Sequence, residues 1–441
     1  MLRSAPGALA TDLDRTSARR SPPRPTRLAA AVVALFALAS AALPVPIVVP
    51  FLLLGTVAGC LLVDLIALRH RTLALERTRA QTLSLLVPVA FRASVSGLDG
   101  ARAVRIRQPV PPTLKVDPPW AEGANLEGEL TGRHRGVHEL PSVTVRVAGP
   151  LGLASIDHTV GTRQEVTVFP DLPRARRLAA ARRRGRSSDE GRVRARLGLG
   201  TEFEAIRDYS QDDDIRQVNW IATARVGRPM SNQYRIEENR DLMCLVDAGR
   251  LMASPIGPMS RLDVALNAVA VLAVAAEEAG DRVGTLAFEA KVTRQLAPHR
   301  RGAEAVVRAL FDLEPTEVES DYERAFHAVG RQKRALVVVF TDLVDEGAGR
   351  TLIAATPVLA RHHVVLVASC TDTDLSTLSS RPPRDLHDVM ASATAAELLA
   401  GRKRAVKLLQ RLGAVVVEAP PESLGPTCVD AYLTLKRHAR L

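Results

Sequence analysis

The chain has 441 residues, too many for one ordinary domain and enough for two or three. Hydrophobic residues make up 46% of it, and 59 Lys and Arg against 48 Asp and Glu give a formal net charge of +11. No basic surface interleaved with aromatic residues accompanies this charge, which argues against a nucleic-acid partner. The 4 cysteines form no Cys-x-x-Cys pair, which argues against a zinc site or a disulfide framework.

The N-terminal part of the chain predicts a membrane anchor. Residues 1–27 are rich in Arg, Ser and Pro, which is typical of a disordered basic tail. Residues 28–68 hold two apolar runs separated by Pro44 and Pro46, and this pattern predicts a hairpin of two transmembrane helices. A cleaved signal peptide is a second interpretation of the first run, but another apolar run follows it at once. Arginines on both flanks predict cytoplasmic ends, a multi-pass location in the cell membrane, and contact with membrane lipid.

The next two segments differ sharply in composition. Residues 80–171 contain short alternating apolar runs broken by Pro and Gly, which predict a small antiparallel β-sandwich domain. Residues 172–199 form an Arg-rich linker with few large apolar residues. We expect this linker to be solvated, with binding to an anionic lipid surface as a second possibility.

A dense set of charged and aromatic residues follows in 200–240, beginning GTEFEAIRDYSQDDDIRQVNWIATAR. Apolar residues at helical spacing predict a short helix from Ile215 to Arg225, with the acids at 212–214 as its cap and first turn. A second interpretation is a polar cluster that fixes a joint between domains or receives a partner. Its members would be Glu202, Arg207, Asp213 and Arg216.

From residue 241 to 441, buried strands and helices alternate. This pattern predicts a doubly wound α/β domain with a mostly parallel sheet covered on both faces. Ligands of such sheets bind beyond the carboxyl ends of the strands. Asp247 and Asp342 each follow a predicted strand, so we expect both at that edge.

The stretch at 200–225 resembles the signature of a bacterial membrane-protein family, the domain of unknown function number fifty-eight. That signature runs Gly-x-Glu-Phe, Arg-x-Tyr, Gly-Asp-Asp-x-Arg, Trp and Ala-Arg. Asp212 and Ile221 depart from the pattern, at positions where the family has Gly and usually Lys. The matching residues are Gly200, Glu202, Phe203, Arg207, Tyr209, Asp213, Asp214, Arg216, Trp220, Ala224 and Arg225.

The resemblance also implies a von Willebrand factor A-like fold for the C-terminal domain. Domains of that type often hold Mg²⁺ through Asp-x-Ser-x-Ser, a distant Thr and a second Asp. Here Asp247 and Asp342 fit the two acids, and Ser320 stands near the Thr position, but Gly249 and Leu251 replace both serines. Because Mg²⁺ requires several oxygen ligands, this degenerate set predicts no bound metal, and we expect no other cofactor. Asp247 would then cap the next turn or pair with Arg250.

These observations favour a membrane-anchored, non-enzymatic adaptor that binds other proteins. The resemblance implies a MoxR-type AAA+ ATPase as partner, acting in the assembly or maturation of other proteins. The chain itself lacks the Gly-x-x-x-x-Gly-Lys-Ser/Thr loop that binds ATP phosphates. Two alternatives remain: a metal-assisted hydrolase using the acids of the signature, and an anionic-lipid binder using the linker. The expected partner-binding residues are Glu202, Arg207, Tyr209, Asp213, Asp214, Arg216, Trp220 and Arg225.

Overall fold

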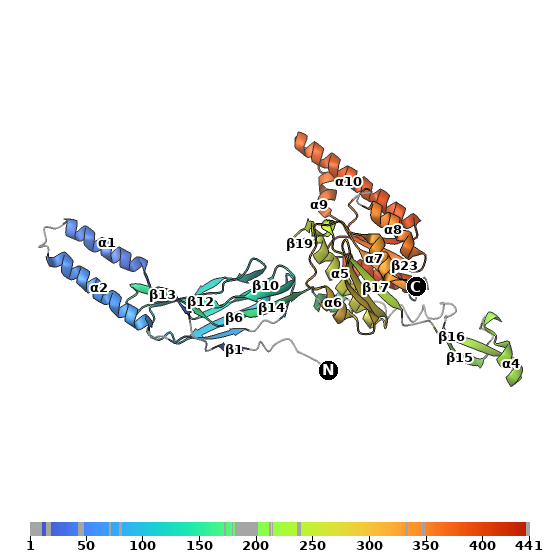
Figure 1. Cartoon of the computed structure of the whole chain (residues 1–441), viewed down its shortest axis with the longest axis horizontal. Helices are drawn as coiled ribbons and strands as arrows, with labels where there is room; N and C mark the ends of the chain where they lie inside the picture. The colour runs from blue at the N-terminus through green and yellow to red at the C-terminus, as the bar shows by residue number, and fades with distance from the viewer. Residues whose placement is uncertain are drawn as a thin grey trace. The chain divides into compact units, whose positions relative to one another are not determined.

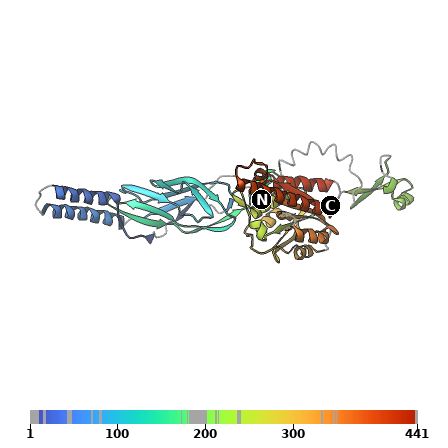
Figure 2. The same ribbon diagram turned by 90° about the horizontal axis from the view of Figure 1, so that it is seen from above.

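The computed structural model divides the chain into two compact units, Met1–Phe169 and Pro170–Leu441 (Figures 1 and 2). It describes residues 11–14, 19–42, 48–69, 72–78, 82–171, 173–178, 180, 202–210, 213, 215–235, 240–330, 334–344, 347 and 349–437.

Two N-terminal helices, α1 (Arg27–Ala42) and α2 (Val48–Arg69), contact each other in the first unit. Within the described part of the chain, no helix combines the length and the apolar character needed to cross a membrane. The prediction of two transmembrane helices is therefore wrong, as is the multi-pass location drawn from it. The 16 residues of α1 fall short of the roughly 20 that a span requires. In α2, Leu68 is fully buried and the helix contacts the neighbouring sheet, so part of the apolar run packs on protein.

Strands precede these helices, where the sequence predicted only a disordered tail. Strand β1 (Thr11–Asp14) pairs with β4 (Ala74–Thr78) in an antiparallel ladder. The short strands β2 (Arg19–Arg20) and β3 (Arg24–Pro25) both pair with β13 (Ala154–Val160). Backbone hydrogen bonds thus hold part of the basic segment on the sheets that follow it.

The strands of the first unit form sheets that are antiparallel except for one pair, in agreement with the strand pattern predicted between 80 and 171. One sheet has the order β1-β4-β6-β10-β8, and another has β2-β13-β12-β7-β9. Buried and exposed residues alternate along β6, which is typical of a strand with one face in the core. A third sheet, β11-β14-β5, contains one parallel pair. The strands are β5 (Thr82–Ser84), β6 (Val89–Ser96), β7 (Ala103–Arg107), β8 (Leu114–Asp117), β9 (Trp120–Glu122), β10 (Asn125–Gly132), β11 (Gly136–Leu140), β12 (Val143–Ala148) and β14 (Gln164–Phe169).

Asp64 joins α2 to the turn between β12 and β13. Its carboxylate accepts hydrogen bonds from the backbone N–H groups of Leu151 at 2.8 Å, Leu153 at 2.7 Å and Ala154 at 3.1 Å. A Cβ atom at Gly149 would collide with this carboxylate, so the turn requires glycine there. The turn that contains Gly149 thus receives a buried acid, and Asp64 fixes the helix to the sheet.

The second unit contains a six-stranded mixed sheet of order β21-β20-β17-β22-β23-β24, in which only the β21–β20 pair is antiparallel. This agrees with the alternation of strands and helices predicted for 241–441. The strands are β17 (Asp241–Asp247), β20 (Arg282–Phe288), β21 (Val292–His299), β22 (Ala335–Phe340), β23 (Val364–Cys370) and β24 (Val415–Ala419). A small hairpin of β18 (Pro255–Ile256) and β19 (Met259–Ser260) follows the 3₁₀ turn η2 (Arg250–Ala253).

Helices cover both faces of this sheet (Figures 1 and 2). Helix α5 contacts α6 and α11, whereas α7 contacts α8, and α8 also contacts α10. All six residues of β22 are buried, as expected for a central parallel strand between two helical layers. The helices are α5 (Arg261–Glu278), α6 (Ala303–Leu310), α7 (Tyr322–Val329), α8 (Arg350–Ala360), α9 (Thr373–Ser380), α10 (Leu386–Arg411) and α11 (Leu424–Arg437).

Candidate functional site

The carboxyl ends of β17 and β22 bring Asp247 and the Thr341–Asp342 pair to one edge of the sheet. The two strands are parallel neighbours, with Val246 opposite Phe340, so the residues that follow them must lie close together. The predicted location of both acids is therefore correct. Both are nevertheless buried, with only 2% of Asp247 and 4% of Asp342 exposed.

Both carboxylate oxygens of Asp247 accept hydrogen bonds from other groups of the chain. One carboxylate oxygen accepts from the Ser320 hydroxyl and from the backbone N–H of Gly249 at 2.8 Å. The other accepts from the hydroxyls of Tyr322 and Thr341, each at 2.6 Å. Arg250 pairs with Glu319 at 3.2 Å instead of with Asp247. The carboxylate thus accepts one backbone N–H and three hydroxyl groups, while Gly249 is the N-cap of η2.

Tyr322 is one of the residues here that the sequence did not point to. It is the first residue of α7, and its ring meets those of Phe288 and Phe326 in edge-to-face contacts. Burial raises its pKa well above the usual value, and the nearby Asp247 charge raises it further. The phenol therefore stays protonated and acts as a hydrogen-bond donor to Asp247.

Gly249 and Leu251, which replace the two serines, have different surroundings. A Cβ atom at Gly249 would collide with the Ser320 hydroxyl and would lie 2.9 Å from the carbonyl oxygen of Val318. No side chain fits at that position in the present arrangement. Leu251 is half-buried and lines a pocket of about 100 Å³ together with Arg250 and Glu319.

Asp342 lies between two buried arginines. A carboxylate oxygen is 3.0 Å from the Arg261 guanidinium and 3.8 Å from that of Arg402. Burial raises the pKa of Asp342 above its usual value, and the two guanidinium charges offset only part of this rise. Its second oxygen, Oδ2, has no hydrogen-bond partner among the described residues.

These residues do not fit the Mg²⁺ that domains with a complete set of ligands often hold. Both oxygens of Asp247 already have two donors each, and a guanidinium contacts Asp342 at close range. The single unpartnered oxygen of Asp342 cannot by itself supply the several oxygen ligands that Mg²⁺ needs. What the site can do is hold the ends of several strands and helices in one fixed arrangement.

The signature residues form a separate small arm. Strand β15 (Glu202–Asp208) pairs with β16 (Met230–Arg235), and between them lie the 3₁₀ turn η1 (Ile215–Gln217) and helix α4 (Trp220–Val226). Asp212 and Asp214 fall outside the described residues. Glu202 lies on β15, but its side chain is likewise outside the description.

Asp213 organises the turn after β15. Its carboxylate contacts the Arg207 guanidinium at 2.5 Å and accepts the backbone N–H of Ser210 at 2.9 Å. The Tyr209 hydroxyl donates to the backbone carbonyl of Asp213 at 3.2 Å. The Ser210 hydrogen bond and then Arg207 lower the pKa of Asp213 against the effect of desolvation. Three predicted signature residues, Arg207, Tyr209 and Asp213, are thus brought together. Asp213, one of the acids considered for a hydrolase, accepts hydrogen bonds that fix the turn.

Helix α4 begins later than predicted. Asn219, and not the run of acids, is its N-cap, because the Asn219 side chain accepts the backbone N–H of Ala222 at 2.9 Å. The signal for this cap was in the sequence, since Asn is a preferred N-cap residue. Arg216 lies in η1 and Arg225 in the last turn of α4, and both are exposed.

Trp220 and Ile221, at the start of α4, are exposed by 69% and 78%. Ile215, Ile206 and Val226 of the same arm are exposed as well. Large apolar side chains gathered on a small arm are typical of a contact surface for another molecule.

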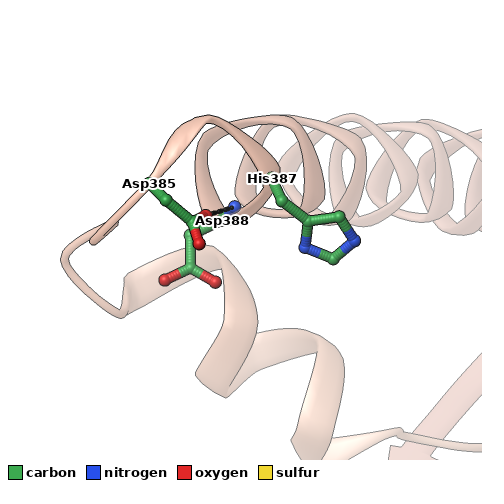
Figure 3. A group of neighbouring side chains, drawn as sticks. All are labelled: Asp385, His387 and Asp388. Atoms are coloured by element: carbon green, nitrogen blue, oxygen red, sulfur yellow. Dashed lines mark hydrogen bonds between the residues drawn. The ribbon is translucent and has the colours of Figure 1, made fainter.

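Another group of possible metal ligands, Asp385, His387 and Asp388, lies at the start of α10 (Figure 3). Asp385 accepts the backbone N–H of Asp388 at 2.7 Å, and Asp388 accepts that of Arg384 at 3.1 Å. Figure 3 shows these two acids together at the first turn of the helix. Hydrogen bonds to backbone N–H groups at the start of α10 account for the two acids without a metal.

The fold and these contacts define an α/β unit with a fixed strand-end network and an exposed arm. Residues 205–394 match a family model described as Protein of unknown function DUF58. This match covers most of the arm and both strand-end acids. The membrane character and the von Willebrand factor A-like fold named with the resemblance are not part of this finding.

Similar proteins are found in mycobacteria. Uncharacterized protein Rv1480 of Mycobacterium tuberculosis and Uncharacterized protein Mb1516 of Mycobacterium bovis are each 26% identical to this chain over 178 residues. The aligned region is 38% of this chain and 55% of each relative, so the chain spans about half their length.

Proposed function

We propose that this protein is a non-enzymatic adaptor whose arm, β15 to β16, contacts a protein partner through Trp220 and Ile221. The exposure of Trp220 is the observation that carries the proposal. Tryptophan is among the residues that contribute most to protein interfaces, and it is highly buried on average. This chain has only 2 tryptophans, and one of them, Trp220, is the first residue of α4 and is 69% exposed.

The signature divides into two sets of residues with different surroundings. Arg207, Tyr209 and Asp213 bond to one another or to the turn between them. Trp220 and Ile221 instead project from a helix that Asn219 caps. We infer that the first set shapes the arm and the second set contacts the partner.

The proposed partner is a MoxR-type AAA+ ATPase, which the family resemblance implies, with a role in the assembly or maturation of other proteins. ATP hydrolysis would occur in that partner. We further propose that the α/β unit is von Willebrand factor A-like. Asp247 and Asp342 are too deeply buried to contact a partner directly, so the exposed strand-end contact would fall to Arg250 and Glu319.

The experiment is capture of partners by the full-length protein and by the Trp220→Ala variant. Loss of a central aromatic contact should weaken binding of an AAA+ ATPase roughly tenfold or more. The matched control is Trp120→Ala. Trp120, the other tryptophan, is 46% exposed on β9 and its ring lies 4.7 Å from the Arg105 guanidinium. Equal capture by wild type and Trp220→Ala, or equal loss in both variants, would contradict the proposal.

A further inference from the structure

We propose that Arg261 and Arg402 supply, as fixed parts of the protein, the positive charge that a divalent cation supplies in domains with a complete strand-end metal site. The strand-end edge of this chain is then held in one arrangement at any Mg²⁺ concentration. The inference concerns the α/β unit and does not depend on the proposed partner or on the arm.

Arg261 is placed by the start of α5. Ser260 and Asp263 form a capping box in which each side chain accepts the backbone N–H of the other residue, at 3.1 and 2.8 Å. This box fixes the first turn of the helix. The Arg261 guanidinium then reaches Asp342 at 3.0 Å and Asp372 at 3.4 Å, so it bridges the residues that follow β22 and β23.

Arg402 approaches the same edge from α10. Its guanidinium donates to the Ser369 hydroxyl at 2.9 Å and to the backbone carbonyl of Cys370 at 2.8 Å. It also contacts Glu418 of β24 at 2.5 Å and lies 3.8 Å from Asp342. One side chain thus ties α10 to the ends of three neighbouring strands.

The chemistry of these two residues explains why a cation is not needed. Two guanidinium groups, with their side chains 9% exposed, face the three carboxylates of Asp342, Asp372 and Glu418. Guanidinium remains charged at any physiological pH and presents several donors in fixed directions, so it can bridge several acceptors at once. Unlike a bound ion, it cannot dissociate. Asp247, the other acid at this edge of the sheet, accepts hydrogen bonds from hydroxyl groups and a backbone N–H instead of from a guanidinium.

The test is thermal unfolding of the full chain in MgCl₂ and in EDTA. In the wild type, the transition of the α/β unit should have the same midpoint in both solutions. Removing one partner of a buried charged network is strongly destabilising, so Arg402→Met should lower the midpoint by roughly 10 °C. Arg402→Lys should recover only part of that loss, because one ammonium group cannot reach the same set of acceptors. Arg308→Met is the matched control, since Arg308 pairs with Glu304 on the surface, and its effect should be small.

A second comparison uses Arg261→Met, which leaves Asp342 without its nearest cation. In that variant the midpoint should fall by the same amount in MgCl₂ and in EDTA, because Arg402 stays beside Asp342 and the site still offers too few oxygen ligands for Mg²⁺. Either of two results would overturn the inference. The first is a wild-type midpoint that rises in MgCl₂ or falls in EDTA. The second is Arg402→Met unfolding like the Arg308→Met control.

Discussion

Several acids of this chain act as hydrogen-bond acceptors that fix the backbone. Asp64 binds three backbone N–H groups of one turn, and Asp247 binds one N–H and three hydroxyls. A buried carboxylate needs such donors because it has lost its hydration. In this chain, therefore, buried acids at turns and strand ends indicate positioning residues.

Asp64→Ala tests this role at a single residue. Hydrogen bonds to a charged group contribute about 1.5–3 kcal/mol each, and the three of Asp64 share one carboxylate, so we expect the free energy of unfolding to fall by about 3 kcal/mol. Urea denaturation of the full chain measures the change. Asp99→Ala is the control, because Asp99 is exposed. If the two variants unfolded alike, Asp64 would not hold α2 to the sheet.

The sequence predicted the positions of the strand-end acids but not their partners. Asp247 and Asp342 were found because each follows a buried apolar run, and that is local information. Tyr322, Arg261 and Arg402 are far from them along the chain, and only the packing of α5, α7 and α10 on the sheet brings them close. No residue pattern near the acids indicates these contacts.

The signature arm shows how two good helix caps compete within one element. The acids at 212–214 and Asn219 are both suitable N-cap residues. The prediction took the acid run as the N-cap because it directly precedes the apolar residues at helical spacing. In the structure, the Asp213 carboxylate instead binds the Ser210 N–H and the Arg207 guanidinium. Asn219 therefore caps a helix that starts at Trp220, and the two strands close the arm.

The arm should lose its order in acid. The pKa of Asp213 is lowered in the folded arm, so its charged form stabilises the turn above the ordinary Asp pKa of about 3.9, and this contribution is lost as the pH falls through the lowered value. Hydrogen exchange of the Ser210 amide, which donates to Asp213, measures the change, corrected for the intrinsic rate. Asp213→Asn should abolish the pH step. A step of the same size in that variant would show that another group causes it.

The whole chain consists of two units with their own cores. The two units meet between Phe169 and Pro170, and alternating runs in the sequence give way to arginines near residue 171. Alternation and turn residues are local signals, so the sequence alone shows where this change of pattern occurs. Apolar content alone predicted the membrane spans wrongly, because it could not show that α2 contacts the sheet and is bound to it by Asp64.

Two separate cores predict two unfolding transitions in the full chain. Calorimetry should show that Asp64→Ala lowers the midpoint of one transition, and that Arg402→Met lowers the midpoint of the other. Each residue makes its described contacts within one unit, Asp64 in the first and Arg402 in the second. Substitutions without shared partners are additive, so the double variant should show both shifts at their separate sizes. If either substitution moved both transitions together, the two units would unfold as one cooperative body.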